Sequence, residues 1–301
     1  MKFGIHCSIR KGFLGALEEA RVVGCDTMQM FTHSPRVWKF RFPPEDVVCE
    51  FIFRRKEYSI SPLVIHTAYL PNPASSNYKI FEYSKELLKL EFEWGAKFFA
   101  DYIVMHPGSF SEGESLETGI KNLVVAIDFC FSSVERYSKV PMLLLENVCR
   151  NGRKIGSSFS ELKEIIDKSK YSGLIGICID TAHLYAYGYE LEKEDGFKKM
   201  VSDIKKSIGI NKLKLFHFND TLSLAGSQVD RHYHIGKGRI GIEGFKRIIS
   251  FKKFSSLPAI IETPKEAKFT EISKKDIENI KLLKKISVDI KSDRSMMRII
   301  S

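Results

Sequence analysis

Eight short β-type runs alternate with longer amphipathic segments along most of this 301-residue chain. The β-type runs are rich in branched and aromatic apolar residues, which favour strands. They cover Lys2–His6, Thr27–Phe31, Leu63–His66, Tyr102–His106, Met142–Glu146, Leu174–Asp180, Leu213–Asn219 and Ala259–Glu262. Between them, apolar residues recur at three- and four-residue spacing, which is typical of helices that bury one face. The clearest such segments are Tyr83–Trp94, Leu116–Val134, Phe159–Ile166, Phe197–Ile208 and Ile242–Ile249.

A chain with this alternation is expected to form a parallel sheet, because each helix carries the chain back to the edge where the previous strand began. Eight repeats between Lys2 and Glu262 predict closure into a (β/α)8 TIM barrel rather than an open sheet. No linker, low-complexity tract or change in composition marks a second domain, so we expect one barrel domain over residues 1–285. Residues 286–301 are expected to be a basic C-terminal tail, frayed or loosely docked from Ser292 onward.

The composition narrows the class of protein. No apolar run reaches the roughly 18 residues that a membrane span requires. Met1–His6 enters a strand-like run directly, so we expect no secretory signal. The six cysteines are scattered without C-x-x-C spacing, so we expect reduced thiols in a cytoplasmic protein, associated with the nucleoid if the cell is prokaryotic. A formal net charge of +10 favours a polyanionic partner.

Ionisable side chains stand at the carboxyl ends of six successive β-type runs, from the third to the eighth. They are His66, His106, Glu146, Asp180, His217 and Glu262. The carboxyl ends of barrel strands share one face, so these side chains are expected to converge at the barrel mouth. Six ionisable groups in a place of low dielectric would repel one another or stay unsatisfied without a cation, which predicts a cluster of divalent metals.

The predicted donor set contains three imidazoles and three carboxylates but no thiolate. This combination suits zinc in a catalytic role, and it also suits manganese or iron. A carboxylate can bridge two ions whereas an imidazole cannot, so we expect a site with more than one metal.

A second group of metal donors follows in the later loops. His183 is expected on the loop after the sixth strand, three residues beyond Asp180. Asp230 and His232 are two residues apart, so in an extended loop their side chains point the same way. This group is sufficient for a further metal. The other histidines near strand ends or in this loop are interpreted as packing, supporting or substrate-side residues, and they are His6, His33 and His234.

Paired metals suit one type of chemistry in particular. Two ions about 3.5–4 Å apart can activate a water, stabilise the transition state of phosphoryl transfer and neutralise the leaving oxygen. The sequence contains no Ser-His-Asp order, P-loop or Gly-rich dinucleotide motif that would indicate another reaction. The predicted ligands therefore favour phosphoryl transfer.

Seven short motifs occur in order between Phe3 and Thr263. They are His66–Leu70 (HTAYL), Met105–Ser109 (MHPGS), Leu145–Asn147 (LEN), Cys178–His183 (CIDTAH), His217–Asp220 (HFND), Val229–His232 (VDRH) and Ile261–Thr263 (IET). Together they resemble the endonuclease IV family of apurinic/apyrimidinic endonucleases. The resemblance implies a barrel with three zinc ions that acts in base excision repair, cleaving DNA 5′ to an abasic site and leaving 3′-hydroxyl and 5′-deoxyribose phosphate ends. Removal of blocked 3′ ends, and manganese at some positions, are compatible with it.

The resemblance also assigns each candidate ligand to one of three ions. The first would be held by His66, His106 and Glu146. The second would be held by Glu146, acting as a bridge, and by Asp180, His217 and Glu262. The third would be held by His183, Asp230 and His232. A hydroxide between the first two ions would be the nucleophile, with Glu146 and Glu262 as the catalytic carboxylates that orient or deprotonate the water.

Substrate recognition can be carried over in the same way. Phe31–Trp38 resembles the family's first DNA-recognition loop, from which Arg36 would enter the minor groove. Tyr69 and Leu70 would fill the gap left by a flipped-out abasic nucleotide. Such a nucleotide has already lost its pairing and much of its stacking, so flipping it costs less than flipping a normal base. The expected partner is double-stranded DNA that contains abasic sites, bound by a monomer without any membrane association.

The chain departs from the family pattern in three places. Gln228 stands where a basic residue is expected, so one phosphate contact is open to question. Pro71-Asn72-Pro73 stiffens the loop after Leu70, and the Lys-rich segment after Lys274 is longer than the family core requires.

Two other functions remain open at this point. A sugar isomerase or epimerase on the same type of barrel would explain the ligands at the strand ends. It would not explain the second donor group or the Arg36, Tyr69 and Leu70 side chains. A non-catalytic binder of damaged DNA would keep the recognition loops, but the complete ligand set argues against loss of catalysis.

Overall fold

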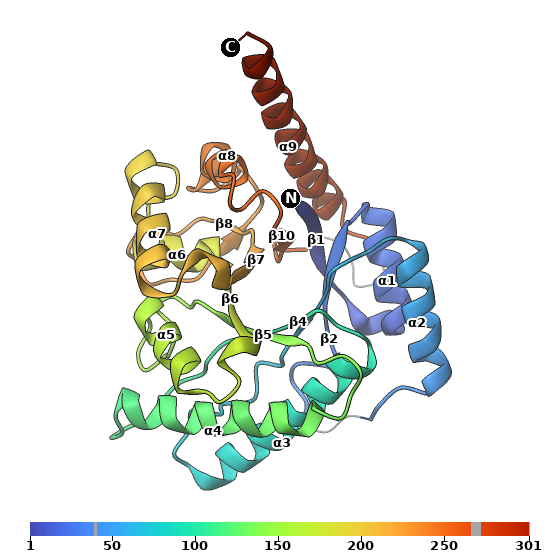
Figure 1. Cartoon of the computed structure of the whole chain (residues 1–301), viewed down its shortest axis with the longest axis vertical. Coiled ribbons are helices and arrows are strands. Elements are labelled where there is room, and N and C mark those ends of the chain that lie inside the picture. The colour runs from blue at the N-terminus through green and yellow to red at the C-terminus, as the bar shows by residue number, and fades with distance from the viewer. Residues whose placement is uncertain (39–40, 266–271, 301) are drawn as a thin grey trace.

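The computed structural model describes residues 1–38, 41–265 and 272–300, with side chains described as far as Ser292. Eight parallel strands close into a barrel in the order β1-β10-β7-β6-β5-β4-β3-β2 (Figure 1). Their bounds are β1 Lys2–Cys7, β2 Thr27–Phe31, β3 Leu63–His66, β4 Tyr102–Met105, β5 Met142–Glu146, β6 Ile175–Asp180, β7 Leu213–His217 and β10 Pro258–Ile261. The expected (β/α)8 TIM barrel is confirmed, and each predicted strand agrees with the observed one to within two residues at either end.

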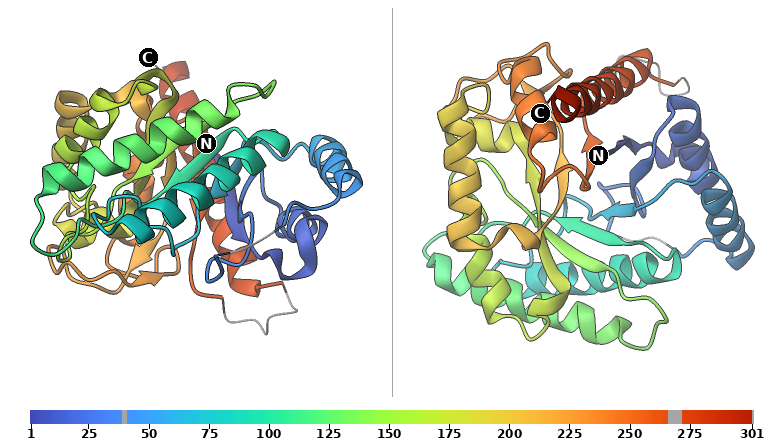
Figure 2. Two further views of the ribbon diagram at one scale, coloured as in Figure 1. Left: turned by 90° about the horizontal axis from the view of Figure 1, so that it is seen from below. Right: turned by 45° about the horizontal axis from the view of Figure 1, so that its top comes forward.

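Helices surround the barrel on its outside (Figure 2). They are α1 Gly12–Val23, α2 Glu45–Glu57, α3 Tyr78–Lys97, α4 Leu116–Val134, α5 Phe159–Lys168, α6 Thr181–Tyr187, α7 Glu194–Ser207, α8 Gly241–Ser250 and α9 Lys274–Ile300. Short 3-10 turns occur at Ile9–Lys11, Ser172–Leu174 and Ile210–Lys212. Helices α3, α4 and α5 begin where the side chains of Asn77, Ser115 and Ser158 accept a hydrogen bond from a backbone N–H of the first turn. In the part of the chain that the structure covers, no helix has the length and apolar character needed to span a bilayer.

The C-terminal segment differs from the expectation. Helix α9 runs through residue 285 without a break, and Leu283 and Ile286 are buried against the barrel. Its later part projects beyond the barrel (Figure 1). The backbone stays helical to Ile300, so the structure shows no fraying from Ser292, and Ser301 lies outside the described residues. The alternative expectation, a loosely docked segment, stays a prediction. The division of the chain at residue 285 stays a prediction.

The barrel interior explains why the strand-end side chains converge. Its small apolar cluster consists of Val64, Val104, Leu144, Cys178, Leu215 and Ile260. Each of these residues stands two positions before one of the six ionisable residues at the strand ends. Side chains alternate between the two faces of a strand, so a residue two positions further along points the same way. The six ionisable side chains therefore form the next layer of the barrel interior, at its mouth.

Candidate metal centre

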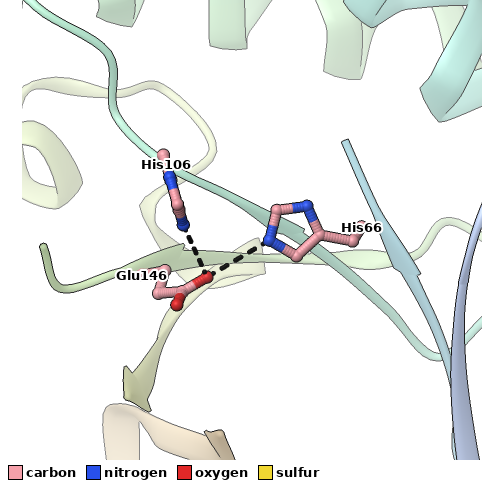
Figure 3. A group of neighbouring side chains, drawn as sticks. All are labelled: His66, His106 and Glu146. Atoms are coloured by element: carbon pink, nitrogen blue, oxygen red, sulfur yellow. Dashed lines mark hydrogen bonds and ion pairs between the residues drawn. The ribbon is translucent and has the colours of Figure 1, made fainter. Parts of the chain in front are cut away.

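The first group of donors joins strands β3 and β5 with the residue that follows β4. His66 Nε2 lies 3.3 Å and His106 Nε2 lies 3.2 Å from the same oxygen, Glu146 Oε2. Figure 3 shows both imidazoles directed at this carboxylate. One donor atom from each residue lies within 4.8 Å of the others, which is a separation that one metal ion can span.

The second group shares Glu146 with the first. It consists of Glu146, Asp180, His217 and Glu262, again with donor atoms within 4.8 Å of one another. His217 Nδ1 lies 3.0 Å from Glu146 Oε1 and 3.3 Å from Glu262 Oε2. The two oxygens of Glu146 therefore face different groups, which is the arrangement of a carboxylate that bridges two ions.

The third group lies where β6 leaves the barrel. Its donors are Asp180, His183 and His232, and Asp230 lies between the two imidazoles. Asp230 Oδ2 is 3.1 Å from His183 Nε2, and Asp230 Oδ1 is 3.1 Å from His232 Nε2. Asp180 belongs to the second and the third groups, so the three groups form one continuous cluster.

Asp180 has a structural role as well. Helix α6 begins directly after it, and Asp180 Oδ1 accepts a hydrogen bond of 2.9 Å from the backbone N–H of His183. His183 therefore lies in the first turn of this helix, and its expected place on a loop is wrong. The helix fixes the distance between the second and the third groups, because it fixes the step from Asp180 to His183.

The orientation of the imidazoles fits metal ions. His66 Nδ1 donates to the carbonyl of Thr67 at 2.7 Å, and His183 Nδ1 donates to the carbonyl of Asn147 at 2.8 Å. With the proton on Nδ1, a neutral ring presents the lone pair of Nε2 to the nearby carboxylate. Two acceptors that face each other repel unless a cation lies between them. The donor set of imidazoles and carboxylates suits zinc, manganese or iron.

Without metals, protons would be the neutralising cations. Burial would lower the pKa of His183, but the carboxylates of Asp180, Asp230 and Glu146 hold this pKa well above its ordinary value. Burial would also raise the pKa of Glu146, but the imidazoles of His217 and His106 hold it well below its usual range. The cluster thus requires positive charge at neutral pH, and metal binding would release the protons.

Neutral polar residues that the sequence analysis missed orient these ligands. Gln29 on β2 is buried, and its Nε2 donates to Glu262 Oε1 at 2.6 Å. Its Oε1 accepts from His217 Nε2 at 2.9 Å, which turns Nδ1 of that ring toward the carboxylates. Gln29 also lies 2.9 Å from His6 Nδ1. Gln29 and His6 are paired in register, so they lie at the same level of the barrel.

Two asparagines hold the backbone of the site. Asn147 Oδ1 accepts a hydrogen bond of 2.7 Å from the N–H of Asp180. Asn219 donates from Nδ2 to Asp180 Oδ2 at 2.6 Å and accepts from the N–H of Glu262 at 2.8 Å. Both side chains are buried, so they fix the ends of β6 and β10 in relation to each other.

Asp220 organises the segment that carries Asp230 and His232. The short antiparallel strands β8 (Asp220–Thr221) and β9 (His232–Tyr233) form the base of this segment. The buried carboxylate of Asp220 accepts hydrogen bonds from four backbone N–H groups, which belong to Thr221, Gly238, Ile240 and Gly241. One side chain therefore closes both ends of the loop.

The residues expected to contact DNA lie on the rim of the mouth. Tyr69 is 64% exposed, and its ring centre lies 5.4 Å from that of Phe31 and 6.4 Å from that of His106. Arg36 is exposed and borders a hollow of about 550 Å³. Leu70 is partly buried beside Tyr69. The structure thus places Tyr69 beside the metal-ligand residue His106 and Arg36 in a hollow that His6 and Phe31 also line. Contact of the three side chains with DNA stays a prediction.

Comparisons with known proteins agree with this geometry. The family described as "Xylose isomerase-like TIM barrel" matches residues 17–286. A relative from Halothermothrix orenii, "Probable endonuclease 4", is 38% identical over 285 residues, which cover 95% of this chain and 100% of the relative. The crystal structure of endonuclease IV from Thermus thermophilus has a TM-score of 0.83 and 28% identity, and the match covers 96% of this chain and 100% of that one.

A further solved structure shares the fold alone. A D-tagatose 3-epimerase-like protein has a TM-score of 0.73 but only 20% identity, over 98% of this chain and 100% of that one. The sequence similarity therefore separates the nuclease relatives from the epimerase. It confirms the resemblance that the seven motifs indicate, and the chain belongs to the endonuclease IV family, a family of nucleases on the xylose isomerase-like TIM barrel.

Proposed function

We propose that this protein is a metal-dependent endonuclease of base excision repair that hydrolyses the phosphodiester bond 5′ to an abasic site in duplex DNA. The observation that carries the proposal is the convergence of nine imidazole and carboxylate side chains in three linked groups at the barrel mouth. The donors favour three zinc ions, and manganese at some of the positions is compatible with the same ligands.

The reaction follows from the position of the carboxylates. When bound, the divalent ions would act as Lewis acids on the phosphate and lower the pKa of a water. Glu146 faces two groups, and Glu262 lies between His217 and Gln29, so these two carboxylates can orient the water or accept its proton. Hydrolysis of the phosphodiester bond 5′ to the abasic site leaves a 3′-hydroxyl and a 5′-deoxyribose phosphate. The same centre could act on blocked 3′ ends, because their phosphodiester presents the same atoms.

Selection of the damaged site is proposed to depend on the rim residues. Tyr69 and Leu70 would occupy the gap in the duplex, and Arg36 would enter from the minor groove. An abasic nucleotide is flipped out at lower cost than a paired one, so damage is selected without reading sequence. A net charge of +10 supports binding to the phosphate backbone. We expect the protein to act in the cytoplasm, as a monomer.

The proposal is tested with a duplex that contains one tetrahydrofuran abasic analogue. The metal-loaded protein should cut this duplex on the 5′ side of the analogue and leave the matched intact duplex uncut. If it leaves both duplexes uncut and instead interconverts ketoses, the isomerase alternative is correct. If it binds the damaged duplex without cutting it under any metal condition, the non-catalytic alternative is correct.

A further inference from the structure

Helix α3 contacts both of the loops that carry the rim residues. The first recognition loop covers residues 31–38, which include Arg36. The second recognition loop is defined as residues 67–73, which include Tyr69 and Leu70. Ser84 and Glu91 stand seven residues apart on α3, two helical turns along the same side. Each of them bonds to the second recognition loop.

Glu91 lies at the point where the two loops meet. It is completely buried, and its Oε1 accepts a hydrogen bond of 2.8 Å from the backbone N–H of Ala68. The same oxygen lies 3.7 Å from Nδ1 of His33 in the first recognition loop. Tyr69 and Leu70 follow directly after Ala68, so their backbone starts from an anchored position. Neither the proposed chemistry nor the metal centre requires this carboxyl group.

Asn72 fixes the other end of the second recognition loop. Its backbone N–H donates to Ser84 Oγ at 2.8 Å. Its side chain makes two hydrogen bonds of 2.9 Å with the backbone of Ser109, on the segment that follows His106. A Cβ atom at Gly108 would lie 2.5 Å from Asn72 Oδ1, so this approach needs glycine there. The loop is thus tied to a metal-ligand segment as well as to α3.

The first recognition loop has its own contact with the helix. Trp38 is 43% exposed, and its ring centre lies 6.2 Å from that of Tyr83, the residue before Ser84. Both loops therefore contact the same helix. Ordering a loop costs free energy on binding, and a loop that is already ordered avoids this cost.

We infer that α3 holds the second recognition loop in its DNA-binding conformation before DNA arrives, with Glu91 and Asn72 as positioning residues on which discrimination between abasic and intact duplex depends. The inference rests on the proposed function. Intact duplex offers no gap for Tyr69 and Leu70, so binding to it depends mainly on phosphate contacts. Loosening the loop should therefore weaken binding to damaged duplex and leave binding to intact duplex nearly unchanged.

The test compares two substitutions at Glu91 in the metal-loaded protein. Glu91→Leu removes the acceptor for the Ala68 N–H, whereas Glu91→Gln keeps a carbonyl oxygen there. Burial raises the pKa of Glu91 to about 8, so the neutral amide resembles the group that is present at pH 7. Glu91→Leu should lose about tenfold in affinity for the tetrahydrofuran duplex, as expected for one lost buried hydrogen bond. Glu91→Gln should keep the wild-type affinity.

Amide hydrogen exchange provides the second readout, because it reports on the loop without DNA. Exchange at residues 67–73 should accelerate in Glu91→Leu and stay slow in Glu91→Gln. The matched control is Glu93→Leu, which removes another mostly buried carboxyl group of α3 that pairs with Arg136. This control should leave loop exchange and duplex discrimination unchanged, and all variants should retain the wild-type metal content.

Unchanged discrimination and loop exchange in a folded Glu91→Leu protein would overturn the inference, and so would failure of Glu91→Gln to restore them. If Glu91→Leu does not fold, Asn72→Ala takes its place with the same expected losses. A wild-type protein that shows no preference for damaged duplex contradicts the proposed function, and the exchange measurement then still decides whether Glu91 anchors the loop.

Discussion

Replacing Asp220 by Asn should release the third donor group and leave the other two in place. Asp220 Oδ1 accepts from the N–H groups of Thr221 and Ile240, and Oδ2 accepts from those of Gly238 and Gly241. In asparagine one of these oxygens is replaced by an NH2 group, which cannot accept a hydrogen bond. The two backbone N–H groups that bonded to this oxygen then have no acceptor. A buried donor without an acceptor costs about 1–3 kcal/mol, so two of them cost about 2–6 kcal/mol.

Loss of these hydrogen bonds destabilises the segment between β8 and β9 and the turn that follows it. Gly238 packs closely on this carboxylate, because a Cβ atom there would lie 2.4 Å from Asp220 Oδ1. Asp230 and His232 belong to this segment, so their distances to His183 should no longer be fixed. The first and second groups draw their ligands from the barrel strands and should persist.

Metal content per chain is the assay, measured by elemental analysis after gel filtration without chelator. Wild-type protein should hold three ions and Asp220→Asn about two, with a thermal midpoint lower by roughly 2–4 °C for each kcal/mol lost. The matched control is Asp203→Asn, because the carboxylate of Asp203 is bonded to Lys199 and Tyr189 near the surface. Three tightly held ions and a wild-type midpoint in Asp220→Asn would refute the reasoning.

Three further predictions concern catalysis, pH and salt. Glu262→Gln should abolish cleavage of the tetrahydrofuran duplex while its affinity in a gel-shift assay survives, because affinity depends largely on phosphate contacts; a comparable loss of binding would contradict this role. Burial raises the pKa of Glu91 from 4.5 to about 8, so folding binds a proton between these values and the stability contributed by this group is lost as pH rises from about 4.5 to 8. The free energy of unfolding of wild type should therefore fall relative to that of Glu91→Gln over this range, by about 1.4 kcal/mol per pH unit. Parallel curves for the two proteins would count against a raised pKa of Glu91. Duplex affinity should fall steeply with salt, with a log–log slope of about −0.9 per phosphate contact, and a flat dependence would exclude a polyanionic partner.

The sequence was sufficient for the barrel and for the strand-end ligands because both depend on simple periodicities. An ionisable residue at the end of an apolar run is conspicuous, and the two-residue repeat of a strand places it beside the residues of the interior layer such as Val64 and Leu144. Gln29 was missed, and Asn147 and Asn219 were given no role although they belong to two of the motifs, because a neutral polar side chain in or after a strand gives no comparable signal. Their roles depend on which atoms face each other, and only the folded chain shows this.

Other features depend on contacts between distant segments. The β8–β9 pair consists of two-residue strands, which are too short for a recognisable periodicity. The closing of its loop by Asp220 involves residues that are 18 to 21 positions away in the sequence. The continued helix at the C-terminus was missed for a different reason, because Ile286 and Ile290 pack on the barrel while the surrounding residues are polar.

The most direct test of the metal centre is anomalous scattering at the zinc edge from crystals of the zinc-loaded protein. The predicted result is three peaks at the barrel mouth. One should lie among His66, His106 and Glu146, the second between Glu146 and Glu262, and the third between His183 and His232. A single peak, or peaks bound outside these groups, would contradict the proposal that the nine side chains form one centre for three ions.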